Sequence, residues 1–453
     1  MIRKKTTRRD FIRYSALTAS SLWLAHGAGC RLFSPKPEPN YRSPNERMNL
    51  AFIGVGGRGR SNLKALANEN IVALCDVDDK NAEASYKEYP HVKKYHDFRK
   101  MFDEMHQQID AVVISTPDHM HALPAMIAMQ LGKHVYCEKP LTHDLYEARM
   151  LAKTAAEYGV ATQMGNQGTS TDGFRAGVEA IRGGVIGKIT EAHIWTNRPV
   201  WPQGMPRPTE TPPVPEHLQW DLFIGTAPYR PYHPSYQPFN WRGWWDFGTG
   251  ALGDMGCHTA NMAFMGLQLR SPVSAEAKNS EFSRDSFPTW SVITLDFPAR
   301  LDLPPVTWTW YDGSDKKPAW VNEKLSGLIH GEKLAGSGLV LIGDKGSLYS
   351  PDDYGENWLL QPKEKFEAMA SVAPTLPRCS GQHHEEWIQA CKGGAPAMSN
   401  FAYAGPLTET LLLGNVAMNT GRKLDWDGAN CKVTNCDDAN ALVRRNYRKG
   451  WAW

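Results

Sequence analysis

Short apolar runs alternate with longer helix-like stretches over residues 48–165. The runs are four to eight residues long and mostly apolar, which is typical of parallel strands that are buried on both faces. We predict strands at residues 49–53, 71–75, 110–117, 134–140 and 161–164, and helices between them at residues 60–68, 121–131 and 145–158. Strands that alternate with helices predict an α/β domain with a doubly wound parallel sheet, the Rossmann architecture.

The pattern changes after residue 165. Strand-like runs now follow one another with few helices between them, and Asp344-Lys345-Gly346 is typical of a tight hairpin turn. We predict helices at residues 173–182, 259–265 and 384–392, and strands at residues 188–195, 291–297, 306–311, 338–342 and 346–349. Residues 166–425 are therefore predicted to form an α+β domain with a large, open and mainly antiparallel sheet. Residues 426–453 match no pattern and are treated as a C-terminal extension.

A proline-dense insert over residues 199–238 is rich in tryptophan. Long loops inside compact domains are usually functional, and flat aromatic faces stack on sugar rings. Packing inside the domain or at a subunit interface explains the same tryptophans equally well. We expect four aromatic side chains to face a substrate: Trp195, Trp201, Trp241 and Tyr311. Trp201 and Trp241 are favoured for stacking on a sugar, because they lie beside polar loop residues.

The charge is unevenly distributed along the chain. The net charge is +2, but residues 1–29 contain six basic residues and one acidic residue, so the remainder carries −3. A slightly acidic body offers no electrostatic surface for nucleic acid. Arg8 and Arg9, followed by Phe11 and a weak apolar stretch, resemble a twin-arginine signal. We predict export to the periplasm, a proline-rich tether over residues 30–47, and contact with a membrane only through a lipid on Cys30.

A glycine-rich turn follows the first predicted strand. Gly54, Gly56 and Gly59 occupy the G-x-G-x-x-G positions, which allow a tight turn, approach of a pyrophosphate and close packing of the next helix. Asp76 ends the second strand, 17 residues after the last glycine, where an acid holds ribose hydroxyls and repels a 2′-phosphate. The predicted cofactor is therefore NAD rather than NADP. Further cofactor contacts are expected within the turn and at the carboxyl ends of the strands, from Gly57, Arg58, Ser115, Thr116, Pro117, His119, His121, Glu138, Lys139, Asn166 and Gln167.

Four motifs in this order resemble the Gfo/Idh/MocA oxidoreductases: GVGGRG at 54–59, STPDHMH at 115–121, EKP at 138–140 and GDMGCH at 253–258. The resemblance implies that Lys139 lies beside the nicotinamide and the substrate hydroxyl, with Asp254 and His258 as its catalytic partners. Without the resemblance, Asp254 would more simply cap a helix that opens near residue 259, with a buried histidine after it. Neither His119 with His121 nor His383 with His384 has good metal-ligand spacing, so no catalytic metal is expected. The eight cysteines include no C-x-x-C pair, and a disulfide framework is not expected.

Three functions remain open from the sequence. The first is hydride transfer between tightly bound NAD and a secondary hydroxyl of a sugar or glycoside, with His258 as base and Lys139 as electrophile. The second is a glycosidase that oxidises its substrate transiently, as in some exported relatives, and that needs a further base, for which Tyr311, His330 and Tyr232 are candidates. The third is a cofactor-bearing binding protein without activity. The resemblance also implies a homo-oligomer, a dimer or a tetramer.

Overall fold

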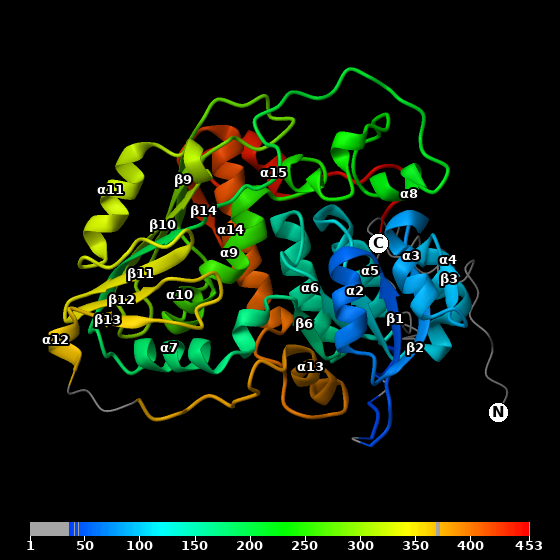
Figure 1. Cartoon of the computed structure of the whole chain (residues 1–453), viewed down its shortest axis with the longest axis horizontal. Coiled ribbons are helices and arrows are strands. Elements are labelled where there is room, and N and C mark those ends of the chain that lie inside the picture. Colours follow the sequence, from blue (N-terminus) through cyan, green and yellow to red (C-terminus); the bar gives the residue numbers. More distant parts are fainter. Residues whose placement is uncertain (1–35, 40, 44, 368–371, 453) are drawn as a thin grey trace, which may run out of the picture.

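The computed structural model describes residues 36–39, 41–43, 45–367 and 372–452. It contains a parallel sheet and a larger mixed sheet, with helices packed on and between them (Figure 1). The predicted signal and Cys30 lie outside the described residues. Within the described part of the chain, no helix has the length and apolar character needed to cross a membrane.

The first sheet has six parallel strands in the order β3-β2-β1-β4-β5-β6. This confirms the predicted doubly wound sheet. The strands are β1 (Asn49–Ile53), β2 (Asn70–Cys75), β3 (Lys93–Tyr95), β4 (Ala111–Ile114), β5 (His134–Cys137) and β6 (Thr162–Met164). The sequence did not predict β3, a three-residue edge strand whose Lys93 and Lys94 are exposed and which therefore lacks an apolar run.

Helices from both halves of the chain pack around this sheet. Those within residues 48–165 are α2 (Gly57–Ala65), α3 (Asp79–Glu88), α4 (Phe98–Met105), α5 (Ala122–Gln130) and α6 (Leu145–Tyr158). Two later helices, α13 (His383–Cys391) and α14 (Phe401–Thr420), also contact it, and α14 packs along α6. The described residues of the predicted tether lie against the same domain, where Arg42 pairs with Asp110 at 3.0 Å.

The second sheet has nine strands in the order β13-β12-β11-β7-β10-β9-β8-β14-β15. Its pairs are antiparallel except for β7 with β10, which confirms the predicted α+β domain. The strands are β7 (Ile189–Trp195), β8 (Ser274–Asn279), β9 (Ser291–Phe297), β10 (Val306–Asp312), β11 (Gly338–Gly343), β12 (Gly346–Ser350), β13 (Leu359–Gln361), β14 (Leu424–Asp427) and β15 (Lys432–Val433). The last two show that the predicted C-terminal extension begins by widening this sheet.

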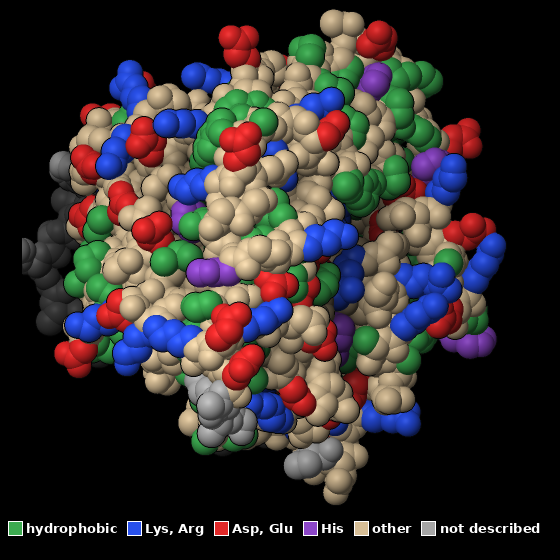
Figure 2. Space-filling view, turned by 60° about the vertical axis from the view of Figure 1, so that its left-hand side comes forward, with side chains coloured by type: hydrophobic (Ala, Val, Ile, Leu, Met, Phe, Trp, Pro, Cys, Tyr) green, Lys and Arg blue, Asp and Glu red, His purple; other side chains and the backbone are tan. Residues whose placement is uncertain are grey.

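Helices cover parts of both faces of the second sheet. Apolar side chains of one face join a core with α7 (Asp172–Arg182), α9 (Gly250–Thr259), α10 (Asn261–Gly266) and α14. On the other face, α11 (Ala319–Leu328) packs on a smaller cluster that includes Trp195 and Tyr311. The short helices α8 (Trp220–Ile224), α12 (Lys363–Phe366) and α15 (Asn440–Val443) complete the set. Figure 2 shows basic and acidic side chains interspersed over the face that it presents.

The helix expected at residues 259–265 corresponds to the short α10 (Asn261–Gly266), but the sequence did not predict the helix α9 that precedes it. Helix α9 begins at Gly250, whose positive φ of 64° gives the chain a sharp entry, and it ends at Thr259, before the short α10. Asp254 and His258 therefore lie inside α9, one turn apart, and Asp254 is not an N-cap. The small side chains of this segment allow the close packing, since a Cβ at Gly256 would lie 2.5 Å from Leu411 of α14.

The proline-dense segment predicted over residues 199–238 is part of a longer stretch, residues 197–249, which is called the insert from here on and has its own aromatic core. Most of the tryptophans predicted there serve packing, because Trp220 and Trp244 are buried among Phe223, Tyr236 and Phe247. The insert also joins the first sheet: Leu218 bridges to Asp78 just beyond β2. It is therefore held beside the carboxyl ends of the parallel strands. All the cysteines of the described residues, including Cys431 and Cys436, are free thiols.

Candidate active site

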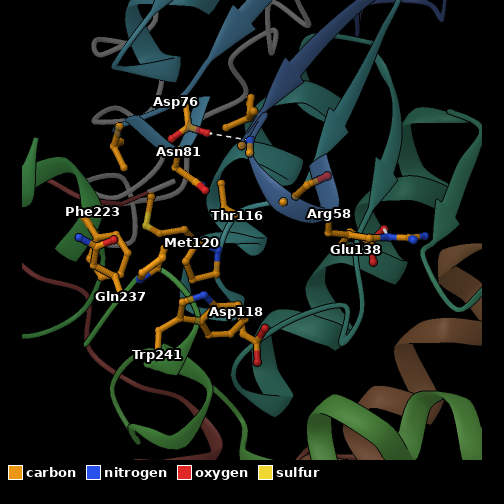
Figure 3. Close-up of a pocket in the computed structure, with 18 of the residues that line it drawn as sticks. Arg58, Asp76, Asn81, Thr116, Asp118, Met120, Glu138, Phe223, Gln237 and Trp241 are labelled. Carbon is orange, nitrogen blue, oxygen red and sulfur yellow. Dashed lines mark hydrogen bonds and ion pairs between the residues drawn. The ribbon is translucent and has the colours of Figure 1, made fainter. Parts of the chain in front are cut away.

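A cavity of about 660 Å³ lies where the parallel strands end, between the Rossmann domain, helix α9 and the insert. Figure 3 shows Phe223, Gln237 and Trp241 of the insert opposite Asp76 and Asn81 of the Rossmann domain, with Met120 beside Phe223. The predicted site residues that line it are Gly54, Gly56, Gly57, Arg58, Asp76, Ser115, Thr116, Pro117, Glu138, Lys139, Gln167, Trp241, Asp254 and His258. The structure thus brings both ends of the predicted site into one cavity.

The glycine-rich turn has the shape that a pyrophosphate requires. Gly54 has a φ of 79°, and a Cβ there would lie 2.6 Å from the carbonyl oxygen of Ser115. A Cβ at Gly59 would lie 1.9 Å from the Gly54 carbonyl oxygen, so the third glycine permits the close packing of α2 on the turn. Helix α2 has no side-chain cap and no acidic residue in its first turn. Its N-terminus therefore presents free N–H groups and a positive dipole to an anion.

Asp76 closes the other side of this turn. Its carboxylate accepts hydrogen bonds from the backbone N–H groups of Val55 at 2.8 Å and Asp78 at 3.0 Å. Burial raises the pKa of the Asp76 carboxyl to about 6, while these hydrogen bonds oppose the rise. A buried acid at the end of β2 is placed to accept from ribose hydroxyls, and its carboxylate repels a 2′-phosphate. The cradle and this donor set fit NAD.

Glu138 belongs to a buried network rather than standing free in the cavity. Arg58 donates to its Oε1 at 2.8 Å, and the Asn62 amide donates to the same oxygen at 2.9 Å. The Asn62 Oδ1 in turn accepts from the Nε2–H of His384 at 3.0 Å, and His384 stacks on Tyr136. Glu138 therefore fixes the start of the loop that carries Lys139.

Lys139 and Asp254 form the central ion pair of the site. The Lys139 ammonium donates to Asp254 Oδ1 at 2.9 Å and to the Asp254 carbonyl oxygen at 2.7 Å. Arg242 of the insert, a residue that the sequence did not single out, donates to the same Oδ1 at 3.2 Å. Burial alone would raise the pKa of the Asp254 carboxyl, but the Lys139 and Arg242 cations lower it to about 2. Asp254 is therefore an anion that positions two cations.

His258 lies one helical turn beyond Asp254 and also lines the cavity. Burial, followed by the charge of Lys139, lowers the pKa of the His258 imidazole well below its ordinary value. The ring is therefore neutral near pH 7. Tyr354, another residue that the sequence did not single out, packs edge-on against His258 with 4.9 Å between ring centroids.

Three residues that were predicted to contact the cofactor lie behind the cavity wall instead. His121 hydrogen-bonds the carbonyl oxygens of Thr116 at 2.8 Å and Pro140 at 2.7 Å, and so ties the Lys139 loop to β4. His119 is buried against Phe223 and Phe247 of the insert, and burial lowers its pKa to about 3. Asn166 donates to the Cys257 carbonyl oxygen beside His258. These three residues position the cavity walls without lining the cavity.

The aromatic residues expected to face a substrate divide into two groups. Trp195 and Tyr311 do not reach the cavity: Trp195 donates to the Ala335 carbonyl oxygen in the core beneath α11, and Tyr311 bonds His193 there. This corrects the prediction, and the reason is that both lie on strands whose side chains pack against α11. Trp241 lines the cavity, while Trp201 lies behind it, against Phe239. Tyr232 is buried in the insert core and His330 is exposed outside the cavity.

No group of three or more His, Cys, Asp or Glu residues with metal-binding geometry is present in residues 36–39, 41–43, 45–367 and 372–452.

Besides Arg242 and Tyr354, the structure adds further residues to the cavity wall. They come from the segments after β2 and β3, from the loop after β4 and from the insert, and include Asp78, Asn81, Phe98, Asp118, Met120, Phe223, Gln237 and Phe239. Two of these residues could have been predicted from their neighbours in the sequence. Asp118 lies inside the STPDHMH motif, and Arg242 follows Trp241, which was itself predicted to face a substrate.

The Rossmann domain provides a cradle that fits NAD and the side chain of Lys139, and the α+β domain provides Asp254 and His258. This combination defines a nicotinamide-dependent class of protein. Comparison with family models agrees. Residues 48–166 match the oxidoreductase family with an NAD-binding Rossmann fold, GFO_IDH_MocA, and residues 190–303 match its C-terminal alpha/beta domain. Together the two matches cover just over half of the chain. The chain belongs to the Gfo/Idh/MocA oxidoreductase family.

Individual relatives share smaller regions with this chain. A glycosyl hydrolase family 109 protein of Solibacter usitatus is 32% identical over 168 residues, which are 33% of this chain and 36% of the relative. Glucose-6-phosphate 3-dehydrogenase of Bacillus subtilis is 31% identical over 122 residues, 26% of this chain and 33% of the enzyme. The chain thus matches about a third of the length of these relatives. The WlbA dehydrogenase of Bordetella pertussis, solved with NADH and UDP-GlcNAcA, shares the fold with a TM-score of 0.58 at 15% identity, over 84% of this chain and 99% of that one.

Proposed function

We propose that this protein is an exported oxidoreductase that acts on a secondary hydroxyl of a sugar or glycoside and keeps NAD bound through its cycle. The observation that carries the proposal is the meeting of Lys139, Asp254 and His258 at one end of the cavity, with the glycine turn and Asp76 at the other. When bound, NAD supplies a hydride acceptor for a carbinol carbon. The same cavity must then hold a hydroxyl-bearing substrate beside Lys139.

The proposed roles follow from the charges of the site. We assign His258 as the acceptor of the hydroxyl proton, because it lines the cavity one helical turn from Asp254, is unprotonated near pH 7 and has no hydrogen-bond partner for Nδ1 among the described residues. The Lys139 ammonium, fixed by Asp254, stabilises the alkoxide and then the carbonyl oxygen. Trp241, with Arg242 stacked 4.2 Å from its ring centroid, offers an aromatic face for the sugar.

A redox-neutral glycosidase is the second candidate, and the similarity to a glycosyl hydrolase family 109 protein supports it. Oxidation of one ring hydroxyl acidifies the neighbouring C–H bond. A base then removes that proton, the aglycone leaves with the electrons of its C–O bond, water adds, and the ketone regains the hydride. Of the groups in the cavity, Tyr354 beside His258 is placed for the additional proton transfer. The previously considered Tyr311, His330 and Tyr232 are not.

One experiment separates these functions. The purified protein is analysed for released NAD and then incubated with a panel of glycosides without added cofactor, with a Lys139→Met variant as the matched control. Accumulation of a ketosugar with bound NADH supports the oxidoreductase. Release of a free reducing sugar with the cofactor oxidised at the end supports the glycosidase. Failure of the wild type to exceed Lys139→Met on any substrate would leave a cofactor-bearing binding protein.

Export is part of the proposal and is supported by Arg8 and Arg9, which lie outside the described residues. Because NAD is made in the cytoplasm, an exported enzyme must carry its cofactor inside the fold. Changing both arginines to lysine is expected to keep the protein in the cytoplasmic fraction, with activity per molecule unchanged. Normal export of that variant would contradict the twin-arginine route.

A further inference from the structure

Residues 444–451, here called the strap, run from the second domain to the Rossmann domain. Figure 1 shows this red segment passing from α15 by α8 to the C label. Its first anchor is Arg445, which donates to Glu147 at the start of α6 at 2.8 Å and lies 3.5 Å from Asp144. Tyr447 donates to the same Glu147 at 2.5 Å. Because both acids are buried, the strap is fixed at this end by charged hydrogen bonds that water does not reach.

Arg448 anchors the strap to the insert. Its guanidinium donates to the Asp221 carboxylate at 2.5 Å and to the Gly225 carbonyl oxygen at 3.0 Å. Its own backbone N–H donates to the Thr226 carbonyl oxygen at 3.1 Å. Asp221 belongs to α8, the helix that also brings Phe223 to the cavity wall. The strap therefore ties the insert to α6 of the Rossmann domain.

Trp451 lies at the far end of the strap and lines the cavity itself. It is only 5% exposed, with the Arg99 guanidinium 4.1 Å from its ring centroid and the Phe98 ring 6.3 Å away. Phe98 lines the cavity as well, as do Asp76 and Val77 at the end of β2. In a dinucleotide-binding sheet this is the adenosine side, since the acid after β2 holds the adenosine ribose.

We propose that Trp451 is an adenosine-contacting residue and that the strap retains the dinucleotide. Trp451 and Phe98 form an aromatic wall beside Asp76, and release of the dinucleotide requires the strap to leave α4 and α8. The inference rests on the proposed function in one respect, that NAD is the group held in the cavity. It adds a residue that lies far from the glycine motif in sequence and outside both family matches.

The test measures cofactor exchange rather than turnover. Wild-type protein, purified with its NAD, is mixed with excess isotopically labelled NAD, and incorporation of the label is followed with time. Loss of one buried aromatic contact predicts exchange at least about tenfold faster in Trp451→Ala. Trp451→Phe, which keeps an aromatic ring, should lie between the two. Trp320→Ala, a half-exposed tryptophan on α11 away from the cavity, should exchange as the wild type does.

Two further measurements localise the effect. Binding of ADP-ribose to stripped protein should weaken in Trp451→Ala as much as that of NAD, while binding of nicotinamide mononucleotide should not change. Arg448→Gln, which loosens the strap outside the cavity, should also speed exchange, with Arg182→Gln in the second domain as its matched control. Arg448→Gln also decides the question if Trp451→Ala does not fold.

The possible failures are distinct. A folded Trp451→Ala or Arg448→Gln protein that exchanges NAD at the wild-type rate would overturn the role of the strap, while NAD binding stood. A wild-type protein that neither carries nor binds NAD would overturn the proposed function first, before the variants are compared. Equal weakening of nicotinamide mononucleotide and ADP-ribose would show a general loss of the fold, and it would also overturn the assignment to adenosine.

Discussion

Replacing Asp254 with asparagine tests the central electrostatic argument of the site. The change keeps the size of the side chain and its Oδ1 acceptor but removes the negative charge from between Lys139 and Arg242. Two cations then face each other across a neutral amide in a buried site. We expect the Lys139 ammonium to turn away from the position in which it would meet a substrate oxygen.

The size of the effect follows from the pKa of Asp254. Its fall from 3.8 to about 2, although burial alone would raise it, corresponds to about 2.5 kcal/mol in favour of the carboxylate. If that stabilisation is what holds Lys139 in place, the rate at which bound NAD is reduced should fall roughly a hundredfold. Because the folded-state pKa is the lower one, the contribution to stability is present above about pH 4 and is lost as the pH falls towards 2. The variant should therefore be less stable at neutral pH and equal to the wild type near pH 2.

The assay mixes purified protein with a sugar identified in the glycoside panel and follows the absorbance of bound NADH in a single turnover. Asp312→Asn is the matched control, because Asp312 is a buried acid in the second sheet that contacts Ser291 and Trp310 and lies outside the cavity. A rate for Asp254→Asn within about threefold of the wild type would refute the argument that this charge positions Lys139.

The remaining predictions concern other parts of the cavity. His258→Asn should reduce the single-turnover rate about 10²–10⁴-fold at neutral pH. Because burial lowers the pKa of His258, the wild-type rate should stay level down to about pH 6. A sharp loss of rate near the ordinary pKa of 6.5 would contradict this. Asp76→Ser should raise the ratio of NADP affinity to NAD affinity about tenfold, as measured by calorimetry on protein from which the bound NAD has been removed. An unchanged ratio would show that Asp76 does not contact the adenosine ribose. Trp241→Ala should raise KM about tenfold and also lower stability, because the ring is buried in the insert core. Trp195→Ala should lower the free energy of unfolding by about 3–5 kcal/mol, measured in urea, without changing KM, so a changed KM for Trp195→Ala would contradict its assignment to the core.

The parallel sheet and its cofactor residues could be predicted because the signals are local. A buried strand is a short apolar run, and the turn after β1 needs glycines for reasons that a few neighbouring atoms decide. The edge strand β3 has no such signal, because exposed lysines occupy two of its three positions. Trp195 could have been assigned to the core, since it lies on a predicted strand and alternation sends its side chain to one face of a sheet.

Helix α9 shows why local signals in the sequence fail elsewhere. The segment GALGDMG lacks a helical pattern and contains three glycines, so its sequence favours a loop. It forms α9 because α14, more than 140 residues later, packs against the surface that Gly256 leaves free. Arg242, Tyr354 and Trp451 were missed for the same reason, since each joins the site only through contacts between segments that are distant in the chain.

The strap and the exposed residues of the cavity wall bear on the mechanism. Trp451 lines the cavity, is 5% exposed and belongs to the strap, whose Arg448 is tied to Asp221 of α8. Phe239 and Tyr354 line the cavity as well, and they are 46% and 43% exposed. A substrate that enters beside these two residues does not have to displace the strap. If the strap retains the dinucleotide, as proposed, NADH does not leave after each turnover. The cofactor must then be restored in place, either by a second substrate or within a single redox-neutral reaction.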